Sequence, residues 1–457
     1  MENSSAPAGS SSGPSVVLNA EQERALLSKI NWRLIPLLFF CYIIAYIDRI
    51  NVGFAKLHLQ AVLGVDTLNY GRVYGLGAGL FFIGYFIFEV PSNLILQRVG
   101  ARIWIARIMI LWGVVSMAMM FMKSVMVFYI MRFLLGAAEA GFFPGVILYL
   151  TYWYPAKERA RTVAWFALGG VAAGVVGSPI SGRILQSFEN VGSLAAWQWL
   201  FLLEALPAIL MGFVILFVLP NRPREVGWLS DSEKAWLQRR LEDEASAASA
   251  HQSHRLSEVF TSGRVWLLCL LYFLMNIGGY GYELWLPSII KSFSGLSDAT
   301  VGWINAIPYL IAAIVMLLVG RHSDKTGERR GHVAAAAICS ALGFALSAYF
   351  SLGAHKNPYF ALASLALAFA GIKSTLGPFW AMTTGFLSGT AAAGGIALIN
   401  SVGNLGGFFG PFIVGQIKDR TGSNLIALLF LGTALLCMGL LTLTVRTGPP
   451  RLADQKN

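Results

Sequence analysis

Runs of about twenty apolar residues recur along the whole chain, and this feature constrains the fold more than any other. A bilayer core holds no water, so a segment that crosses it must satisfy its own backbone N–H and C=O groups, as a helix does. The runs lack the alternation of a barrel strand, so the sequence predicts an all-α membrane protein. Twelve spans are predicted, at 33–54, 71–93, 103–122, 125–147, 162–186, 197–219, 264–289, 300–320, 333–352, 358–387, 392–417 and 423–445.

Composition and charge agree with this class. Hydrophobic residues make up 56% of the chain and charged residues 12%, which is far from the balance of a soluble domain. With the N-terminus in the cytoplasm, 23 of the 34 Lys and Arg residues fall in or beside cytoplasmic segments and eight on the other side. This bias predicts that both termini are cytoplasmic. It also explains the net charge of +11, so no nucleic-acid partner is expected.

A polar stretch at 220–263 divides the spans into two sets of six. Within it, Ser230 and Glu233 have the spacing of a capping box, which predicts an amphipathic helix in a structural or regulatory linker. The predicted organisation is a disordered cytoplasmic tail at 1–30, six-helix halves at 31–219 and 264–445, the linker at 220–263 between them, and a cytoplasmic tail at 446–457.

Nothing in the sequence predicts a metal, a cofactor or an enzyme. The four cysteines lie within apolar runs, and none of the six histidines lies deep in a span. No disulfide framework, metal cluster or nucleophile–base arrangement is therefore expected.

The two halves resemble each other. Glu139 in the fourth span and Lys373 in the tenth each precede a proline, Pro144 or Pro378, by five residues. Parallel repeats of this kind place a binding site between the halves near the bilayer midplane, where rocking of the halves gives alternating access.

Five ionisable residues are predicted to lie deep in the spans: Asp48, Arg49, Arg132, Glu139 and Lys373. A charge near the bilayer centre costs several kcal/mol, so each is a candidate functional residue. We expect Asp48 to meet Arg132 and Arg49 to meet Glu139. If all five were ionised, the cavity would carry one excess positive charge and would attract an anion.

The geometry of these side chains suggests a division of roles. A guanidinium can bind a carboxylate bidentately, so Arg49 is the predicted substrate-binding residue. Glu139 is the predicted proton carrier, with Asp48 and Arg132 supporting it or forming a purely structural ion pair. Lys373 could contact the substrate or neutralise a buried acid such as Glu283, and the sequence leaves both open.

The loop after the eighth span carries a specific motif. It runs Gly320-Arg-His-Ser-Asp324-Lys325-Thr-Gly327-Glu-Arg329-Arg330 and resembles the signature loop of the major facilitator superfamily. The resemblance implies a cytoplasmic latch, in which a carboxylate pairs with cations across the seam and holds one access state.

Longer motifs resemble the anion:cation symporter family within that superfamily. They are Tyr46-Ile-Asp48-Arg49-Ile-Asn51, the stretch from Arg132 through Gly136-Ala-Ala-Glu139 to Pro144, and the stretch from Gly394 through Asn400 to Asn404. The resemblance implies uptake of a small organic acid with protons, by a monomer in a bacterial inner membrane. It also implies that Tyr46, Trp380 and Asn400 face the substrate, although Tyr46 could equally serve helix packing.

The closest alternative is a proton-coupled antiporter that exports a drug or metabolite. The stretch from Gly174 through Gly177-Ser-Pro179 to Gly182 loosely resembles an exporter motif, but Ser178 interrupts it. Export of a cation would also require an acid-rich cavity.

Overall fold

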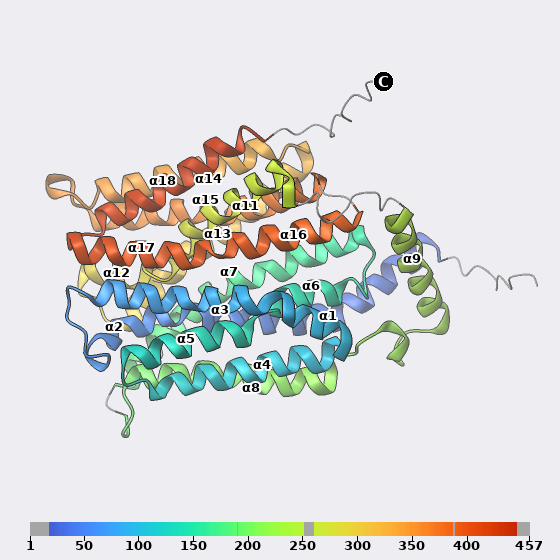
Figure 1. The fold of residues 1–457 in the computed structure, drawn as a ribbon, viewed down its shortest axis with the longest axis horizontal. Coiled ribbons are helices and arrows are strands. Elements are labelled where there is room, and N and C mark those ends of the chain that lie inside the picture. Colours follow the sequence, from blue (N-terminus) through green and yellow to red (C-terminus); the bar gives the residue numbers. More distant parts are fainter. Residues whose placement is uncertain (1–17, 190, 251–259, 387–388, 446–457) are drawn as a thin grey trace, which may run out of the picture.

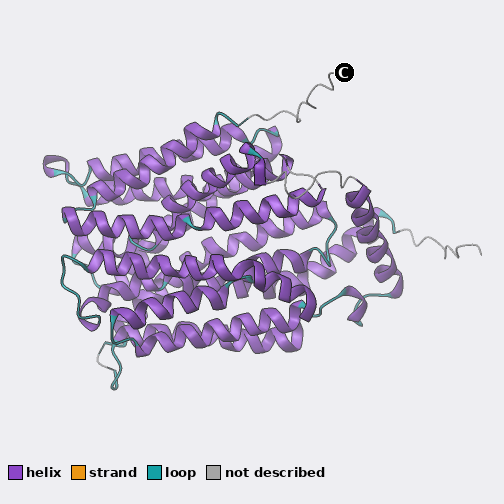
Figure 2. Cartoon of the chain, in the orientation of Figure 1, coloured by secondary structure: helices purple, strands orange, loops and turns teal. Residues whose placement is uncertain are grey.

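The fold is a bundle of long, nearly parallel helices in a computed structural model that describes residues 18–189, 191–250, 260–386 and 389–445. Within those residues the chain is helical with short connections and has no strand (Figure 2). Twelve helical segments are long and apolar enough to cross a bilayer, as the sequence predicted. Apart from the first span, they start and end within six residues of the predicted ones.

The N-terminal half contains the first six spans. Its helices are α1 (Ala20–Ile50), α2 (Val52–Val62), α3 (Tyr70–Val99), α4 (Ala101–Ala118), α5 (Val125–Glu139), α6 (Phe142–Leu150), α7 (Ala156–Ser187) and α8 (Ala196–Val218). The first span joins α1 to α2, and the fourth joins α5 to α6. The N-terminal half forms the lower part of the bundle in Figure 1.

The C-terminal half contains the other six spans, and the linker carries one more helix. The linker helix is α9 (Asp231–Ala250), and the half comprises α11 (Gly263–Glu283), α12 (Leu286–Ser294), α13 (Asp298–Thr326), α14 (Arg330–Tyr349), α15 (Pro358–Phe386), α16 (Gly389–Asn404), α17 (Gly406–Thr421) and α18 (Leu425–Thr442). We call the end of the bundle that carries α9 the α9 end and the opposite end, which carries α2, the α2 end (Figure 1).

The expected disordered tail at 1–30 is wrong for its last eleven positions. The α1 helix begins at Ala20, where the Asn19 side chain accepts hydrogen bonds from the backbone N–H groups of Glu21 and Gln22. Gln22 closes a capping box, which satisfies N–H groups that would otherwise be orphaned. Polar residues therefore extend the first helix well beyond its apolar part, and residues 1–17 lie outside the described chain.

The predicted capping box of the linker is present. Ser230 Oγ accepts a hydrogen bond from the N–H of Glu233, whose carboxylate accepts one from the N–H of Ser230. Lys29 of α1 binds the same carboxylate at 3.0 Å and so holds α9 against the first span. Burial opposes ionisation of Glu233, but these hydrogen bonds prevail and lower its pKa.

The two halves pack closely along α7 and α13 and along α3 and α17. Small residues allow the approach: a Cβ on Gly302 would lie 2.4 Å from the carbonyl oxygen of Ser178, and one on Gly415 would lie 2.1 Å from that of Gly71. Polar contacts strengthen the seam at the α2 end. Asp298 accepts from both His58 and Lys291, at 2.7 and 2.8 Å, and so links α2 to the C-terminal half.

Candidate functional site

The centre of the site is a buried ion pair between Arg49 and Glu139. Arg49 lies in the last turn of α1, and Glu139 is the last residue of α5. The helix stops there because Gly141 adopts a φ of +87°, a conformation that a residue with a Cβ rarely adopts. The break fixes the carboxylate at the level of Arg49, and the predicted contact is confirmed: Arg49 Nη2 binds Glu139 Oε1.

Arg49 also faces the C-terminal half. Its Nη1 donates to the Tyr280 hydroxyl of α11 at 3.0 Å, and its guanidinium lies 5.3 Å from the Phe81 ring. The Nε of Arg49 is buried and has no hydrogen-bond partner among the described residues. A buried donor without a partner is costly, so this guanidinium retains capacity for one more acceptor.

A second buried ion pair lies on the other side of the seam. Lys373 of α15 binds Glu283, the last residue of α11, at 2.9 Å. Tyr46 of α1 joins the pair: its hydroxyl donates to the Glu283 carboxylate at 2.8 and 3.0 Å and accepts from Lys373 at 3.0 Å. Of the two partners left open for Lys373, the structure therefore contains the buried acid.

The expected pairing of Asp48 with Arg132 is wrong. Asp48 accepts from Ser116 at 2.5 Å and from Asn51 at 3.1 Å. Arg132, although fully buried, donates to the backbone carbonyls of Gly77 and Ala78 of α3. No ion pair joins Asp48 and Arg132 within the described chain, because neutral hydrogen-bond partners on α3 and α4 lie closer to each of them.

Asn400 and Trp380 lie farther along the seam. Asn400 of α16 donates to Glu89 of α3 at 2.5 Å, and the neighbouring Ser401 donates to the other oxygen of the same carboxylate at 3.0 Å. Trp380 packs edge-on against Tyr272 of α11, with ring centroids 5.1 Å apart. Glu89 is only 4% exposed, so its carboxylate is buried at the seam.

Sequence reasoning did not identify Tyr280 or Glu89 as members of this site, and it considered Glu283 only as one possible partner of Lys373. The available signal was the rule that an ionisable residue within an apolar run is functional by default. Counting Glu283 also removes the predicted excess of positive charge. Each of the two ion pairs, Arg49 with Glu139 and Lys373 with Glu283, is neutral in itself.

The signature loop is folded upon itself. Asp324 pairs with Arg329 of the same loop at 2.7 Å rather than with a cation across the seam, and Arg330 donates to the carbonyl of Val445. Gly327 ends α13 with a φ of +68°. The described contacts thus tie α13, α14 and the end of α18 together within one half.

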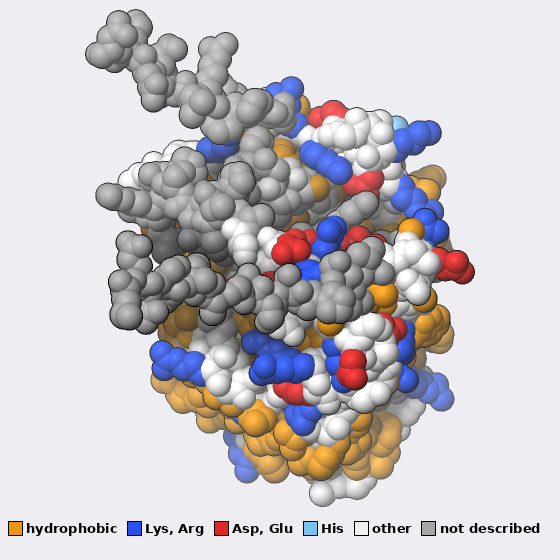
Figure 3. All heavy atoms as spheres, turned by 90° about the vertical axis from the view of Figure 1, so that its right-hand side faces the viewer, with side chains coloured by type: hydrophobic (Ala, Val, Ile, Leu, Met, Phe, Trp, Pro, Cys, Tyr) orange, Lys and Arg blue, Asp and Glu red, His pale blue; other side chains and the backbone are white. Residues whose placement is uncertain are grey.

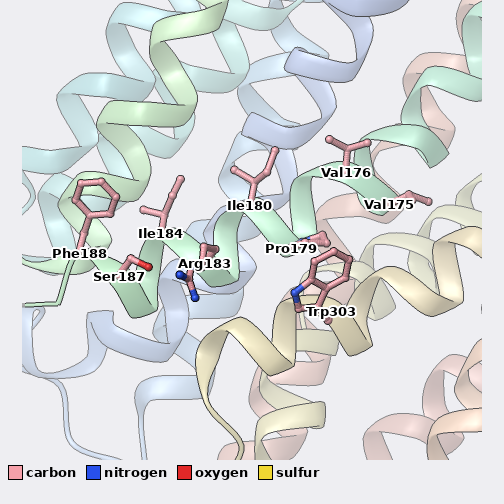
Figure 4. A pocket seen from close by; sticks show the side chains of 9 residues that line it. All are labelled: Val175, Val176, Pro179, Ile180, Arg183, Ile184, Ser187, Phe188 and Trp303. Carbon is pink, nitrogen blue, oxygen red and sulfur yellow. The ribbon is translucent and has the colours of Figure 1, made fainter.

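A surface groove between two helices is a different feature. It has a volume of about 630 Å³ and lies between α7 and α13, where Figure 4 shows Pro179, Ile180 and Trp303 around it. Trp303 is 67% exposed. A groove lined almost wholly by apolar side chains on the outside of a membrane bundle suits lipid chains rather than a charged substrate.

These features define a class of protein. Two six-helix halves with charged residues buried at their seam are the architecture of a transporter that alternates between access states. Within the described residues no cluster of three or more His, Cys, Asp or Glu side chains could hold a metal ion.

The chain belongs to the Major Facilitator Superfamily, whose model matches residues 38–411. It is 48% identical over 433 residues to a "Putative tartrate transporter" of Agrobacterium vitis, covering 94% of this chain and 97% of the relative. It is 42% identical over 424 residues to a "Quinolone resistance transporter" of Acinetobacter baumannii, covering 93% and 95%. The crystal structure of a D-xylose–proton symporter has the same fold, with a TM-score of 0.72 at 17% identity over 90% of this chain and 96% of that one. The protein is therefore a multi-pass membrane transporter and not an enzyme.

Proposed function

We propose that this transporter takes up a small organic anion together with protons, as a monomer in a bacterial inner membrane. The observation that carries the proposal is the buried pair of Arg49 and Glu139, with a guanidinium Nε left free for a further acceptor. The 48% identical relative named for tartrate supports an organic acid as the substrate.

The coupling follows from competition for one guanidinium. A substrate carboxylate that binds Arg49 displaces Glu139, and an ionised carboxylate without a counter-ion is costly at bilayer depth. Glu139 then takes a proton, which it returns when the substrate leaves and Arg49 becomes available again. Anion and proton therefore move together, without a metal.

The α9 end is the cytoplasmic end in this proposal. Lys and Arg side chains gather on that face in Figure 3, as the positive-inside rule requires. At the opposite end the ion pair of His58 with Asp298 joins the two halves, which supports a state closed to the outside. The contact of Asp324 with Arg329 in the signature loop holds α13 and α14 together within one half, so that this half moves as a unit when the halves rock.

The substitution Arg49→Lys tests the proposal. An ammonium keeps the positive charge but cannot bind a carboxylate bidentately. We therefore expect uptake of labelled organic acid to fall by about ten- to a hundredfold, which corresponds to the loss of one or two ionic hydrogen bonds. Uptake into proteoliposomes is measured beside the thermal unfolding of the purified variant. A correctly folded variant with unreduced uptake would contradict the role of Arg49.

Proton-coupled export of a drug or metabolite is the second candidate. It is favoured by the 42% identical relative named for quinolone resistance and by the buried acids Glu89, Glu139 and Glu283 around the seam. The two candidates differ in the direction in which a proton gradient drives the substrate. With protons high outside, import concentrates an acid inside the proteoliposomes, whereas export depletes it.

A further inference from the structure

The two buried ion pairs occupy equivalent places in the two halves, with their charges exchanged. Arg49 and Glu139 come from the first and fourth spans, and Glu283 and Lys373 come from the first and fourth spans of the second half. In the first half the cation lies on the leading span and the acid on the fourth; in the second half the order is reversed. Each half thus presents one cation, already matched with one internal carboxylate, to the same seam.

Tyr46 lies close to both cations. Its ring centroid is 5.7 Å from the guanidinium carbon of Arg49 and 5.3 Å from the ammonium nitrogen of Lys373. The sum of these two distances is therefore an upper limit on the separation between the guanidinium of Arg49 and the ammonium of Lys373. With ionic hydrogen bonds of about 2.8 Å at each end and carbon–carbon bonds of about 1.5 Å, an extended four-carbon dicarboxylate spans about this limit, so it is long enough to reach both cations.

We propose that Lys373 and Glu283 form a second carboxylate subsite, and that the preferred substrate is a short dicarboxylate carried as a dianion with two protons. This inference rests on the proposed function of Arg49 and Glu139. One carboxylate of the substrate binds Arg49 and displaces Glu139, and the other binds Lys373 and displaces Glu283. Tyr46, whose hydroxyl bonds both members of the second pair, positions that pair.

The charges balance in this scheme. Each displaced internal carboxylate takes one proton from the side on which the substrate enters, so two protons offset the two negative charges of the substrate. No uncompensated charge is then carried across the low-dielectric interior, where it would be costly. Transport of the dianion with two protons is therefore electroneutral.

The first test uses the unmodified protein in proteoliposomes on a solid-supported membrane. Tartrate, applied with a proton gradient, serves as the diacid probe, and its monoamide serves as a matched probe with one carboxylate. We expect tartrate to be taken up without a net transport current. Electrogenic uptake of tartrate by the unmodified protein would overturn the two-proton stoichiometry.

The second test removes the second pair without changing the net charge, in the double variant Lys373→Met with Glu283→Gln. The unmodified protein should take up tartrate with a kcat/KM at least about tenfold above that for the monoamide, the effect of one ionic hydrogen bond. The double variant should lose this preference and keep uptake of the monoamide through Arg49. A preference for tartrate that survives the double substitution would overturn the second subsite.

The matched control is the ion pair of Lys29 with Glu233, which joins α1 to α9 away from the seam. The double variant Lys29→Met with Glu233→Gln should retain the preference for tartrate. The single variant Glu283→Gln keeps Lys373 and gives a further readout, since tartrate should then move with one proton and carry a net negative current. Failure of Arg49→Lys to reduce uptake of either probe would instead count against the proposed function, so the two hypotheses fail separately.

Discussion

Replacing Glu139 by Gln separates substrate binding from proton coupling. The amide retains the size of the carboxyl and an oxygen that accepts from Arg49 Nη2, but it cannot exchange a proton. Arg49 no longer has a charged competitor, so a substrate carboxylate should bind at least as tightly as before. Proton-driven accumulation through this residue should disappear.

The size of the effect follows from the proton gradient. One proton moving across a gradient of one pH unit supplies about 1.4 kcal/mol, which is a tenfold concentration ratio. If Glu139 carries one proton, its replacement removes a factor of about ten from the steady-state accumulation at that gradient. If Glu139 is the only residue that couples protons to transport, the ratio of substrate concentrations inside and outside falls to the value reached without a proton gradient.

The assay is accumulation of labelled organic acid in proteoliposomes with an imposed gradient, alongside exchange of the acid without a gradient. Exchange should persist in the Gln variant. Glu204→Gln is the matched control: Glu204 is a buried acid of the same half, bonded to Ser181 at 2.6 Å, and its replacement should leave accumulation unchanged. Full gradient-driven accumulation in Glu139→Gln would refute the proton role of that residue.

Two further predictions concern the seam and the signature loop. Gly302→Ala places a Cβ 2.4 Å from the carbonyl oxygen of Ser178, and overpacking of about 1–3 kcal/mol should disfavour closure at the α2 end and slow uptake. Gly377→Ala is the control, because a Cβ there meets nothing within 4 Å, and it should leave the uptake rate unchanged. Equal uptake rates in the two variants would count against a moving seam. Burial opposes ionisation of Glu328, but hydrogen bonds from Gly331 and His332 prevail and lower its pKa. The ionised carboxylate therefore contributes stability above the ordinary pKa of Glu, and this stability is lost as the pH falls through the lowered pKa of the folded protein. Glu328→Gln should therefore destabilise the protein by roughly 0.5 kcal/mol near neutral pH, because solvent screens this half-exposed carboxylate. The difference in unfolding temperature should vanish in acid, and a difference independent of pH would show that the carboxylate is not responsible.

Much of the first ion pair could be predicted from the sequence alone. Arg49 and Glu139 are charges within apolar runs, and an isolated charge in hydrocarbon needs a partner. The same reasoning failed for Asp48 and Arg132, because neutral groups can take the place of a charged partner. Ser116 and the carbonyls of Gly77 and Ala78 are such groups, and nothing in their sequence context indicates that they face a charge.

What the sequence determined by itself is the twelve-span bundle, its division at the polar linker, and the identity of the charges that must be buried. These follow from local properties, namely the length of each apolar run and the cost of leaving backbone groups unsatisfied in a bilayer. Only the tertiary structure decided that Glu283 and Lys373 mirror Arg49 and Glu139 across Tyr46. That arrangement depends on which faces of α1, α5, α11 and α15 converge, and helix rotation is fixed by packing between residues hundreds of positions apart.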